Sequence, residues 1–116
     1  MQTEREITFF ENHFMDFYLQ QPEAVRKKIE YVLSVIRKVE RVPEKFLKHI
    51  EGTKGLYEIR VEQGSNAYRI FCCFDKGNVV VLFNAFHKKS QKTPTNEIEL
   101  ALKLMNLYFR QMENQT

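Results

Sequence analysis

The chain has 116 residues, of which 43% are hydrophobic and 28% are charged, and its formal net charge at pH 7 is +3. A chain of this length can close one hydrophobic core but is too short for two ordinary domains, so we expect a single domain over residues 1–116. A positive charge of this size is common among proteins and is by itself weak support for a nucleic-acid partner.

Nothing in the sequence indicates a membrane protein. The longest uninterrupted apolar stretch, Val79–Phe83, is far shorter than the ~20 residues that cross a bilayer. The first ten residues carry acidic side chains where a signal peptide has a basic head and a long apolar run. We therefore expect a soluble, cytoplasmic protein that has no membrane partner.

The first half of the chain predicts one strand and two helices. Residues 7–10 predict an opening strand, and residues 14–19 are spaced like a short helix. After Pro22, apolar residues at helical spacing predict a longer helix, and Pro43 is expected to end it. The apolar positions of this longer helix are Val25, Ile29, Val32, Leu33, Ile36 and Val39.

From Gly55 the apolar residues recur at every second position, which is typical of strands. The first strand has Tyr57, Ile59 and Val61 on one face, and a tight turn at residues 63–66 follows it. Two further strands, residues 67–74 and 79–86, flank a second tight turn, and the last strand is apolar enough to be covered on both faces.

The closing segment predicts a helix over residues 94–112, with Thr93 as its N-cap and an apolar stripe that includes Met105 and Tyr108. The expected fold class is therefore α+β: an N-terminal strand and helices, then a three-stranded antiparallel meander, then a C-terminal helix.

The register of the predicted hairpins aligns polar residues across three strands. If the first loop has two residues, Arg60 lies directly opposite Arg69, and a similar second loop places Arg69 opposite Asn84. Opposed like charges destabilise a strand pair, so a protein that retains two such arginines is expected to use them. Two guanidinium groups on one face can hold a phosphate, although Glu58, Glu62 or an acid on a covering helix could instead neutralise them.

A run of basic residues follows the last predicted strand. No acidic residue lies between Asp75 and Glu97, whereas His87, Lys88, Lys89 and Lys92 all do. Such a run is often only a solvated face, but here the strand delivers it to one edge of the sheet that carries the two arginines. A concentrated basic surface of this kind fits a nucleic-acid backbone.

Residues that bind metals or cofactors are poorly represented. The chain has no HExxH motif, no paired-cysteine motif, no glycine-rich phosphate loop followed by lysine and no cluster of acidic residues, so we expect no metal and no cofactor. Cys72 and Cys73 are neighbours in a strand and point to opposite faces, which favours small buried residues over a disulfide. His13 and His49 are expected to be ordinary surface residues.

Four fragments together resemble a known family. Residues 55–61 (GLYEIRV), 67–71 (AYRIF), 86–94 (FHKKSQKTP) and 97–101 (EIELA) are similar to the HigB-like subgroup of the RelE/ParE toxin superfamily, a subgroup also described as phage-derived. The fragments occur in the same order and at the same spacing as in the family. The resemblance runs from the first strand to Tyr108.

The resemblance implies a RelE-like fold and a metal-independent endoribonuclease that cuts mRNA in the ribosomal A site. It also implies a helix-turn-helix antitoxin as partner. Arg69 matches the strand arginine that contacts the scissile phosphate, and Arg60 a basic position on the preceding strand. Lys88 or Lys89 falls where the family has a basic residue after the third strand, and the resemblance implies a catalytic role there, either to protonate the leaving oxygen or to hold the transition state. The residues expected to contact RNA around these four are Lys54, Asn84, His87 and Lys92.

Several alternatives stay open at the level of sequence. The general base could be Glu58, His87, a lysine with lowered pKa, or a group supplied by the ribosome. The same basic face would serve a non-catalytic nucleic-acid-binding protein, and the superfamily also contains gyrase-directed ParE-type toxins. The lysine-rich segment at residues 86–94 favours RNA.

Overall fold

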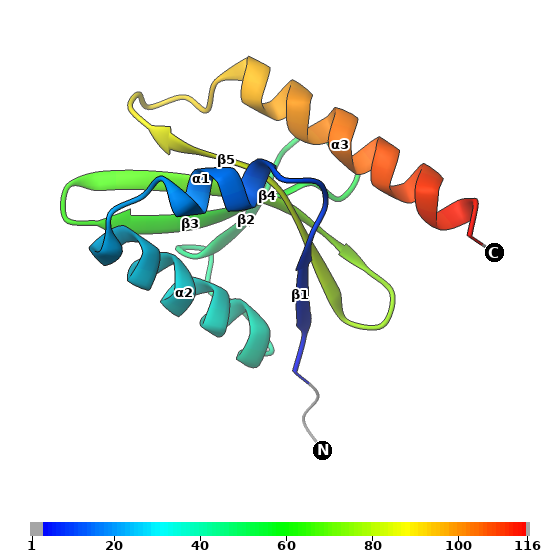
Figure 1. Cartoon of the computed structure of the whole chain (residues 1–116), viewed down its shortest axis with the longest axis horizontal. Coiled ribbons are helices and arrows are strands. Elements are labelled where there is room, and N and C mark those ends of the chain that lie inside the picture. Colours follow the sequence, from blue (N-terminus) through cyan, green and yellow to red (C-terminus); the bar gives the residue numbers. More distant parts are fainter. Residues whose placement is uncertain (1–3, 116) are drawn as a thin grey trace.

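The computed structural model describes residues 4–115, which form one five-stranded sheet with helices on both of its faces (Figure 1). Helices α1 and α2 cover one face, and α3 crosses the other (Figure 1). The strand order is β1-β5-β4-β3-β2. The elements in chain order are β1 Glu6–Phe9, α1 His13–Leu19, α2 Glu23–Lys38, β2 Leu47–His49, β3 Tyr57–Gln63, β4 Asn66–Asp75, β5 Val79–Lys88 and α3 Thr95–Glu113.

The expected α+β class is confirmed, but the chain has one strand more than predicted, β2, and the sheet is larger than the predicted meander. Strands β3, β4 and β5 form the antiparallel meander. Strand β1 adds to its far edge in parallel with β5, with Glu6 opposite Val79, and β2 pairs antiparallel with β3. The sheet is therefore mixed, because the N-terminal strand joins the meander instead of lying apart from it.

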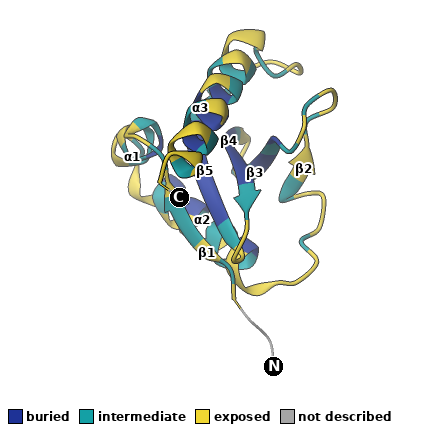
Figure 2. Cartoon of the chain, turned by 90° about the vertical axis from the view of Figure 1, so that its right-hand side faces the viewer, coloured by how far each residue is buried: buried dark blue, intermediate teal, exposed yellow. Residues whose placement is uncertain are grey.

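Two apolar cores lie on opposite faces of the sheet, and the strands are the layer between them (Figure 2). On one face, Ile29 and Val32 of α2 pack with Ile59 and Ile70 of the sheet. The other face holds a second core, in which α3 covers β4 and β5. Strand β5 contributes to both cores, which explains why its residues from Val79 to Phe86 are apolar apart from Asn84.

Cys72 and Cys73 belong to different cores, as their adjacent positions in β4 predict. Both are free thiols, and burial raises the pKa of each, that of Cys73 to about 12. Since the thiolate is the reactive form, these cysteines are inert small core residues.

Helix α2 ends at Lys38, five residues earlier than the predicted stop at Pro43. The guanidinium of Arg5 donates hydrogen bonds to the carbonyl oxygens of Ile36, Val39 and Glu40 at 2.7–2.8 Å. These carbonyls lie at the helix end, where they lack partners within the helix. A residue next to β1 thus caps α2, and proline is not needed to stop it.

The β4–β5 pairing differs from the prediction at its turn and in its middle. Asp75 pairs with Val79, so the loop holds three residues instead of two. Farther along, Ile70 pairs with Ala85 whereas Cys72 pairs with Leu82, so a β-bulge adds one residue to β5 between these pairs. The two shifts together place Phe86, and not Asn84, opposite Arg69.

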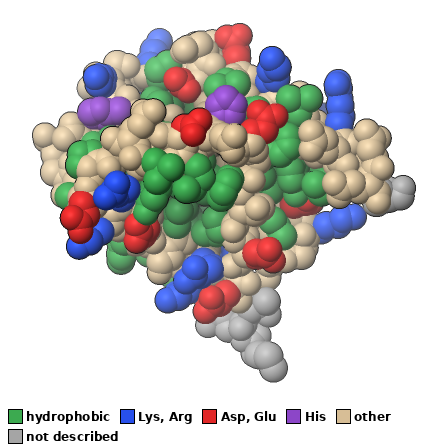
Figure 3. Space-filling view, in the orientation of Figure 1, with side chains coloured by type: hydrophobic (Ala, Val, Ile, Leu, Met, Phe, Trp, Pro, Cys, Tyr) green, Lys and Arg blue, Asp and Glu red, His purple; other side chains and the backbone are tan. Residues whose placement is uncertain are grey.

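The surface of the described residues mixes charged and apolar side chains (Figure 3). Large hydrophobic residues that remain exposed include Leu19 at the end of α1 and Tyr31 on α2. In residues 4–115, no helix combines the length and the apolar character that crossing a membrane requires.

Candidate functional site

The predicted arginine pair lies on the face of the sheet that carries α3. Arg60 of β3 is directly opposite Arg69 of β4, so the predicted register of this hairpin is confirmed. Phe71 and Cys73, which share this face of β4, pack beneath α3. Arg69 lies on the same face two residues before Phe71, toward the hairpin, where its neighbours are charged.

Glu58 lies between the two arginines. One of its carboxylate oxygens, Oε1, accepts a hydrogen bond from Nε of Arg60 at 3.2 Å and forms an ion pair with Nε of Arg69 at 3.6 Å. The second contact is too long for a hydrogen bond, and Nε of Arg69 is buried without one. Glu58 therefore neutralises part of the charge, as the alternative interpretation of the sequence anticipated, but one carboxylate faces two guanidinium groups.

Thr93 forms a hydrogen bond with the other oxygen of this carboxylate. Its hydroxyl donates to Oε2 of Glu58 at 3.1 Å, and the residue therefore does not cap α3 as predicted. Pro94 is at the N-cap position, and no side chain makes a capping hydrogen bond there. The loop before α3 is thus tied to β3, which fixes where the helix begins relative to the arginines.

Lys88 completes the cluster from the end of β5. It pairs with Ala67 and so lies on the same face as Arg69. Desolvation lowers the pKa of its ammonium group, and the positive charges of Arg69, Arg60 and Lys48 lower it further, against the opposite effect of Glu58. Desolvation likewise lowers the pKa of Arg69, although an arginine stays charged at any pH of interest. We call Glu58, Arg60, Arg69 and Lys88 the charged cluster.

A groove of about 250 Å³ opens beside this cluster and is named here the Glu58 groove. Glu58, Arg60 and Lys88 line it together with residues from two loops, one between β2 and β3 and one between β5 and α3. Its other lining residues are Lys48, His49, Ile50, Glu51, Gln91, Thr93 and Ile98. A basic groove at the end of a sheet is a suitable place for an anionic ligand.

Two predicted site residues lie elsewhere. The amide of Asn84 donates to the carbonyl oxygen of Glu97 at 3.0 Å and to its carboxylate at 3.1 Å, so Asn84 joins β5 to the first turn of α3. His87 pairs with Tyr68, and its ring stacks on the Tyr68 ring with centroids 4.7 Å apart, on the face that α1 and α2 cover. Neither residue belongs to the charged cluster.

The remaining predicted site residues, the catalytic candidate Lys89 and the RNA contacts Lys54 and Lys92, are exposed and lie in the loops that border the Glu58 groove. Lys54 lies in the loop between β2 and β3, and Lys89 and Lys92 lie in the loop between β5 and α3. They are therefore placed to contact a long ligand that extends beyond the groove. Among the described residues, no three histidine, cysteine or acidic side chains gather in a way that could hold a metal ion.

Sequence reasoning missed Lys48 and Thr93. Lys48 pairs with Glu58 across β2 and β3, but β2 has three residues, too few to show a strand period. Thr93 was predicted to be the N-cap of α3, because a threonine before a proline at a helix start is typical of an N-cap. Its hydroxyl instead binds Glu58.

Comparisons with known proteins give the chain a family and a fold. No curated protein matches the chain. A family model described as "Phage derived protein Gp49-like (DUF891)" matches residues 16–106, which is well over half of the chain. Among solved structures, a chain in the crystal structure of the archaeal RelE-RelB complex from Pyrococcus horikoshii OT3 is similar, with a TM-score of 0.55 and 20% identity. The similarity covers 73% of this chain and 96% of that one, and at this identity it concerns the fold alone.

Proposed function

This chain belongs to the phage-derived Gp49-like family and has a RelE-like fold, and on that premise we propose that it is the toxin of a type II toxin-antitoxin system. Its proposed activity is the cleavage of mRNA on the ribosome, which stops translation. The observation that carries this proposal is the charged cluster: the opposed Arg60 and Arg69, the second of them 6% exposed, and Lys88 on the same face of the sheet, beside loops that bear Lys54, Lys89 and Lys92.

The proposed reaction is an attack by a ribose 2′-hydroxyl on the adjacent phosphate. The 2′-oxygen loses its proton and bonds to phosphorus, the bond from phosphorus to the 5′-oxygen breaks, and that oxygen takes up a proton. The products are a cyclic phosphate and a 5′-hydroxyl. This chemistry requires donors for the extra negative charge that develops on the phosphate and groups that move two protons.

Arg60 and Arg69 are the proposed phosphate ligands. Each guanidinium offers a planar set of donors that matches phosphate oxygens, and Glu58 holds both by their Nε atoms. Since Glu58 contacts both arginines and Thr93, its role in this proposal is to position the arginines, and it is not the free base that the sequence left open.

Lys88 is the proposed acid for the leaving 5′-oxygen. Its lowered pKa brings the ammonium group closer to neutrality, which makes it a better proton donor than an ordinary lysine. His87 faces the opposite side of the sheet and is removed from the candidates for the base. The proton acceptor is therefore proposed to come from the ribosome, which agrees with a ribosome-dependent activity.

The decisive experiment is a reconstituted translation reaction in which the ends of the mRNA fragments are mapped. We expect new 5′-hydroxyl and cyclic phosphate ends on translated mRNA, and far slower cleavage of the same RNA without ribosomes, since positioning of a substrate can be worth several orders of magnitude. Equal rates with and without ribosomes would contradict ribosome dependence. On a minimal RNA, slow cleavage that excess EDTA abolishes and one divalent ion restores would indicate a metal nuclease.

The same reaction separates the two rival functions. A non-catalytic nucleic-acid-binding protein would slow translation without creating new RNA ends. A gyrase-directed toxin would leave translation running at first and would induce DNA damage signalling in expressing cells. Either result would exclude the proposed ribonuclease.

The proposed protein partner is a small helix-turn-helix antitoxin. The similar archaeal chain was crystallised in a complex of RelE with RelB, which supports an antitoxin for this chain as well. We expect a neighbouring gene to encode such a protein, and its product to co-purify with this chain and to restore growth. Growth arrest that persists when the two proteins are co-expressed would contradict this pairing.

A further inference from the structure

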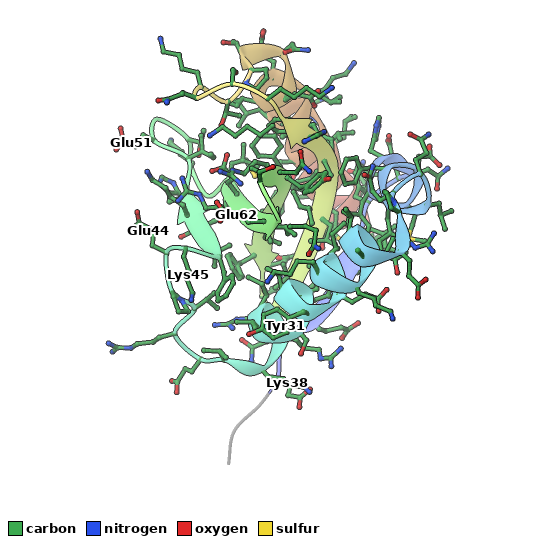
Figure 4. The ribbon with its side chains drawn as sticks, turned by 90° about the vertical axis from the view of Figure 1, so that its left-hand side faces the viewer. Tyr31, Lys38, Glu44, Lys45, Glu51 and Glu62 are labelled. Atoms are coloured by element: carbon green, nitrogen blue, oxygen red, sulfur yellow. The ribbon has the colours of Figure 1, made fainter. Side chains whose placement is uncertain are left out.

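A second groove lies on the other side of Arg60, between α2, the segment that follows it and β3. Its volume is about 370 Å³, and it is named here the Tyr31 groove. Figure 4 shows Tyr31, Lys45 and Glu62 on one side of the molecule. The residues that line the groove are Lys28, Tyr31, Lys45, Phe46, Arg60, Glu62 and Arg69. Because Arg60 also lines the Glu58 groove, the two grooves adjoin the same guanidinium.

Tyr31 is unusually exposed for an aromatic residue on an amphipathic helix. The residue is 54% exposed, whereas the buried stripe of α2 is formed by Val25, Ile29, Val32 and Ile36. The Tyr31 ring meets the ring of Phe46 edge to face, with centroids 6.3 Å apart. Tyr31 thus contributes little to the core, and it presents a ring to the groove beside a second aromatic side chain.

A lysine ammonium group lies over each of these two aromatic rings. The Nζ atom of Lys28 lies 5.4 Å from the centroid of Tyr31, and that of Lys45 lies 5.0 Å from the centroid of Phe46. Among the lining residues, two lysines and two arginines face a single carboxylate, that of Glu62. The groove therefore combines π-faces with an excess of positive charge.

Sites that bind single-stranded nucleic acids have this combination, because the bases stack on aromatic side chains while lysines and arginines contact the phosphates. A purely apolar partner would bring no negative charge to these four cations, of which Arg60 and Arg69 already share the carboxylate of Glu58. We propose that the Tyr31 groove binds a nucleotide of single-stranded RNA next to the phosphate held by Arg60 and Arg69, with its base stacked on Tyr31. The inference rests on the proposed function for the RNA phosphate at Arg60 and Arg69, but it can be tested without cleavage.

The test measures binding of a short, fluorescently labelled RNA whose riboses are 2′-O-methylated, so that it cannot be cut. Replacing Tyr31 by alanine should raise the dissociation constant about 5- to 100-fold, the range expected for the loss of one stacked base. Tyr31→Phe should bind like the wild type, because phenylalanine retains the π-face. Leu19→Ala is the matched control, since Leu19 is 62% exposed, does not line the Tyr31 groove and should not affect binding.

A second measurement needs no variant. RNA that contains 4-thiouridine, irradiated on the wild-type protein, should crosslink to peptides that contain Tyr31 or Phe46. Crosslinks confined to other peptides, an unchanged dissociation constant for Tyr31→Ala, or no binding of the methylated RNA at low salt would each overturn the inference. A Tyr31→Ala variant that no longer binds the antitoxin but still binds RNA with the wild-type dissociation constant would also overturn the inference.

The inference and the proposed function can fail separately. If translated mRNA is not cut but Tyr31→Ala still weakens RNA binding, the groove is a nucleotide site on a non-catalytic protein. If mRNA is cut and Tyr31→Ala changes neither the dissociation constant nor KM, the ribonuclease stands and the nucleotide site is excluded.

Discussion

One face of the sheet has two regions that differ in character, although the same strand, β4, runs through both. Phe71 and Cys73 lie under α3 in a closed apolar core. Arg69, two residues earlier on the same face, joins the charged cluster. The difference lies in the cover: α3 begins at Thr95, and the loop before it is tied to Glu58 through Thr93. Beneath the body of α3 these β4 residues are apolar, whereas beside the start of the helix the buried Arg69 pairs with the carboxylate of Glu58.

The largest effect is expected in the covered region. Phe83 is fully buried in the core beneath α3, and Phe83→Ala should lower the free energy of unfolding by about 3–5 kcal/mol, since it removes a large apolar side chain and leaves a cavity. Urea unfolding measures this loss, with exposed Leu19→Ala as control. A loss below about 1 kcal/mol would mean that α3 covers this face only loosely.

In the charged region, substitution should affect the reaction more than the fold. Arg69→Ala should slow mRNA cleavage about 10²- to 10³-fold, the usual cost of removing a donor aimed at developing charge. Its stability should fall less than that of Phe83→Ala, because Glu58 retains Arg60 and Thr93 as partners. Mapped cleavage rates and urea unfolding should be measured on the same preparation.

A suitable control for Arg69 is Lys103→Ala, an exposed lysine on α3. Lys45 is unsuitable, although it lies outside the charged cluster, because it lines the Tyr31 groove with Arg69. A folded Arg69→Ala variant that cuts mRNA at the wild-type rate would make Arg69 a structural partner of Glu58 and nothing more.

A smaller effect is expected where α3 meets the far end of β4. The hydroxyl of Tyr108 donates to the carboxylate of Asp75 at 2.6 Å, and Tyr108→Phe should cost about 1–2 kcal/mol near neutral pH. Desolvation and this bond raise the pKa of Tyr108 to about 12 from an ordinary value of 10.0. Between these pH values the unfolded chain loses a proton that the folded chain keeps, so stability falls as pH rises.

The phenylalanine variant lacks this titration. The difference in unfolding free energy between wild type and Tyr108→Phe should therefore shrink as the pH rises from 10 to 12, and urea unfolding at several pH values would show it. A difference that stays constant over this range would mean that the Tyr108 hydroxyl is not held in the folded protein.

The smallest effect is expected for His87. Its ring stacks on Tyr68, on the opposite side of the sheet from the charged cluster, and its Nε2 lies 3.2 Å from Oδ1 of Asn66. His87→Ala should leave the cleavage rate within about twofold of wild type, as for a surface substitution away from a site. A loss as large as that for Arg69→Ala would return His87 to the candidates for the base.

The sequence predicted the first hairpin well because its geometry is local. Gly64, with a φ of 62°, permits the two-residue turn, and the turn alone then sets Arg60 opposite Arg69. The predicted pairing of Asn84 with Arg69 in the second hairpin was wrong, because the register there depends on a three-residue loop and on a bulge in the middle of β5. An apolar strand that is buried on both faces has no alternation from which such a bulge could be read.

The cations of the charged cluster were predictable from the sequence, but the contacts that Glu58 makes among them were not. Arg60, Arg69 and Lys88 lie together as expected, since strand pairing connects them. Glu58 at their centre was anticipated as an acid that could neutralise the arginines and as a candidate general base, but not as a residue that contacts both arginines and Thr93. The Tyr31 groove combines α2, the irregular segment after it and β3, and no periodic pattern in the sequence connects these three elements.

The parallel pairing of β1 with β5 has a consequence for how the protein is made. Glu6 cannot pair with Val79 until the ribosome has added Val79, which lies 73 positions later in the chain. At ordinary rates of synthesis this delay is roughly 4–15 s. The hairpin of β3 and β4 can close as soon as it emerges, because its contacts are local. The first strand to be synthesised is thus among the last to be paired, and until β5 appears the growing chain has neither its complete sheet nor Lys88 beside the two arginines.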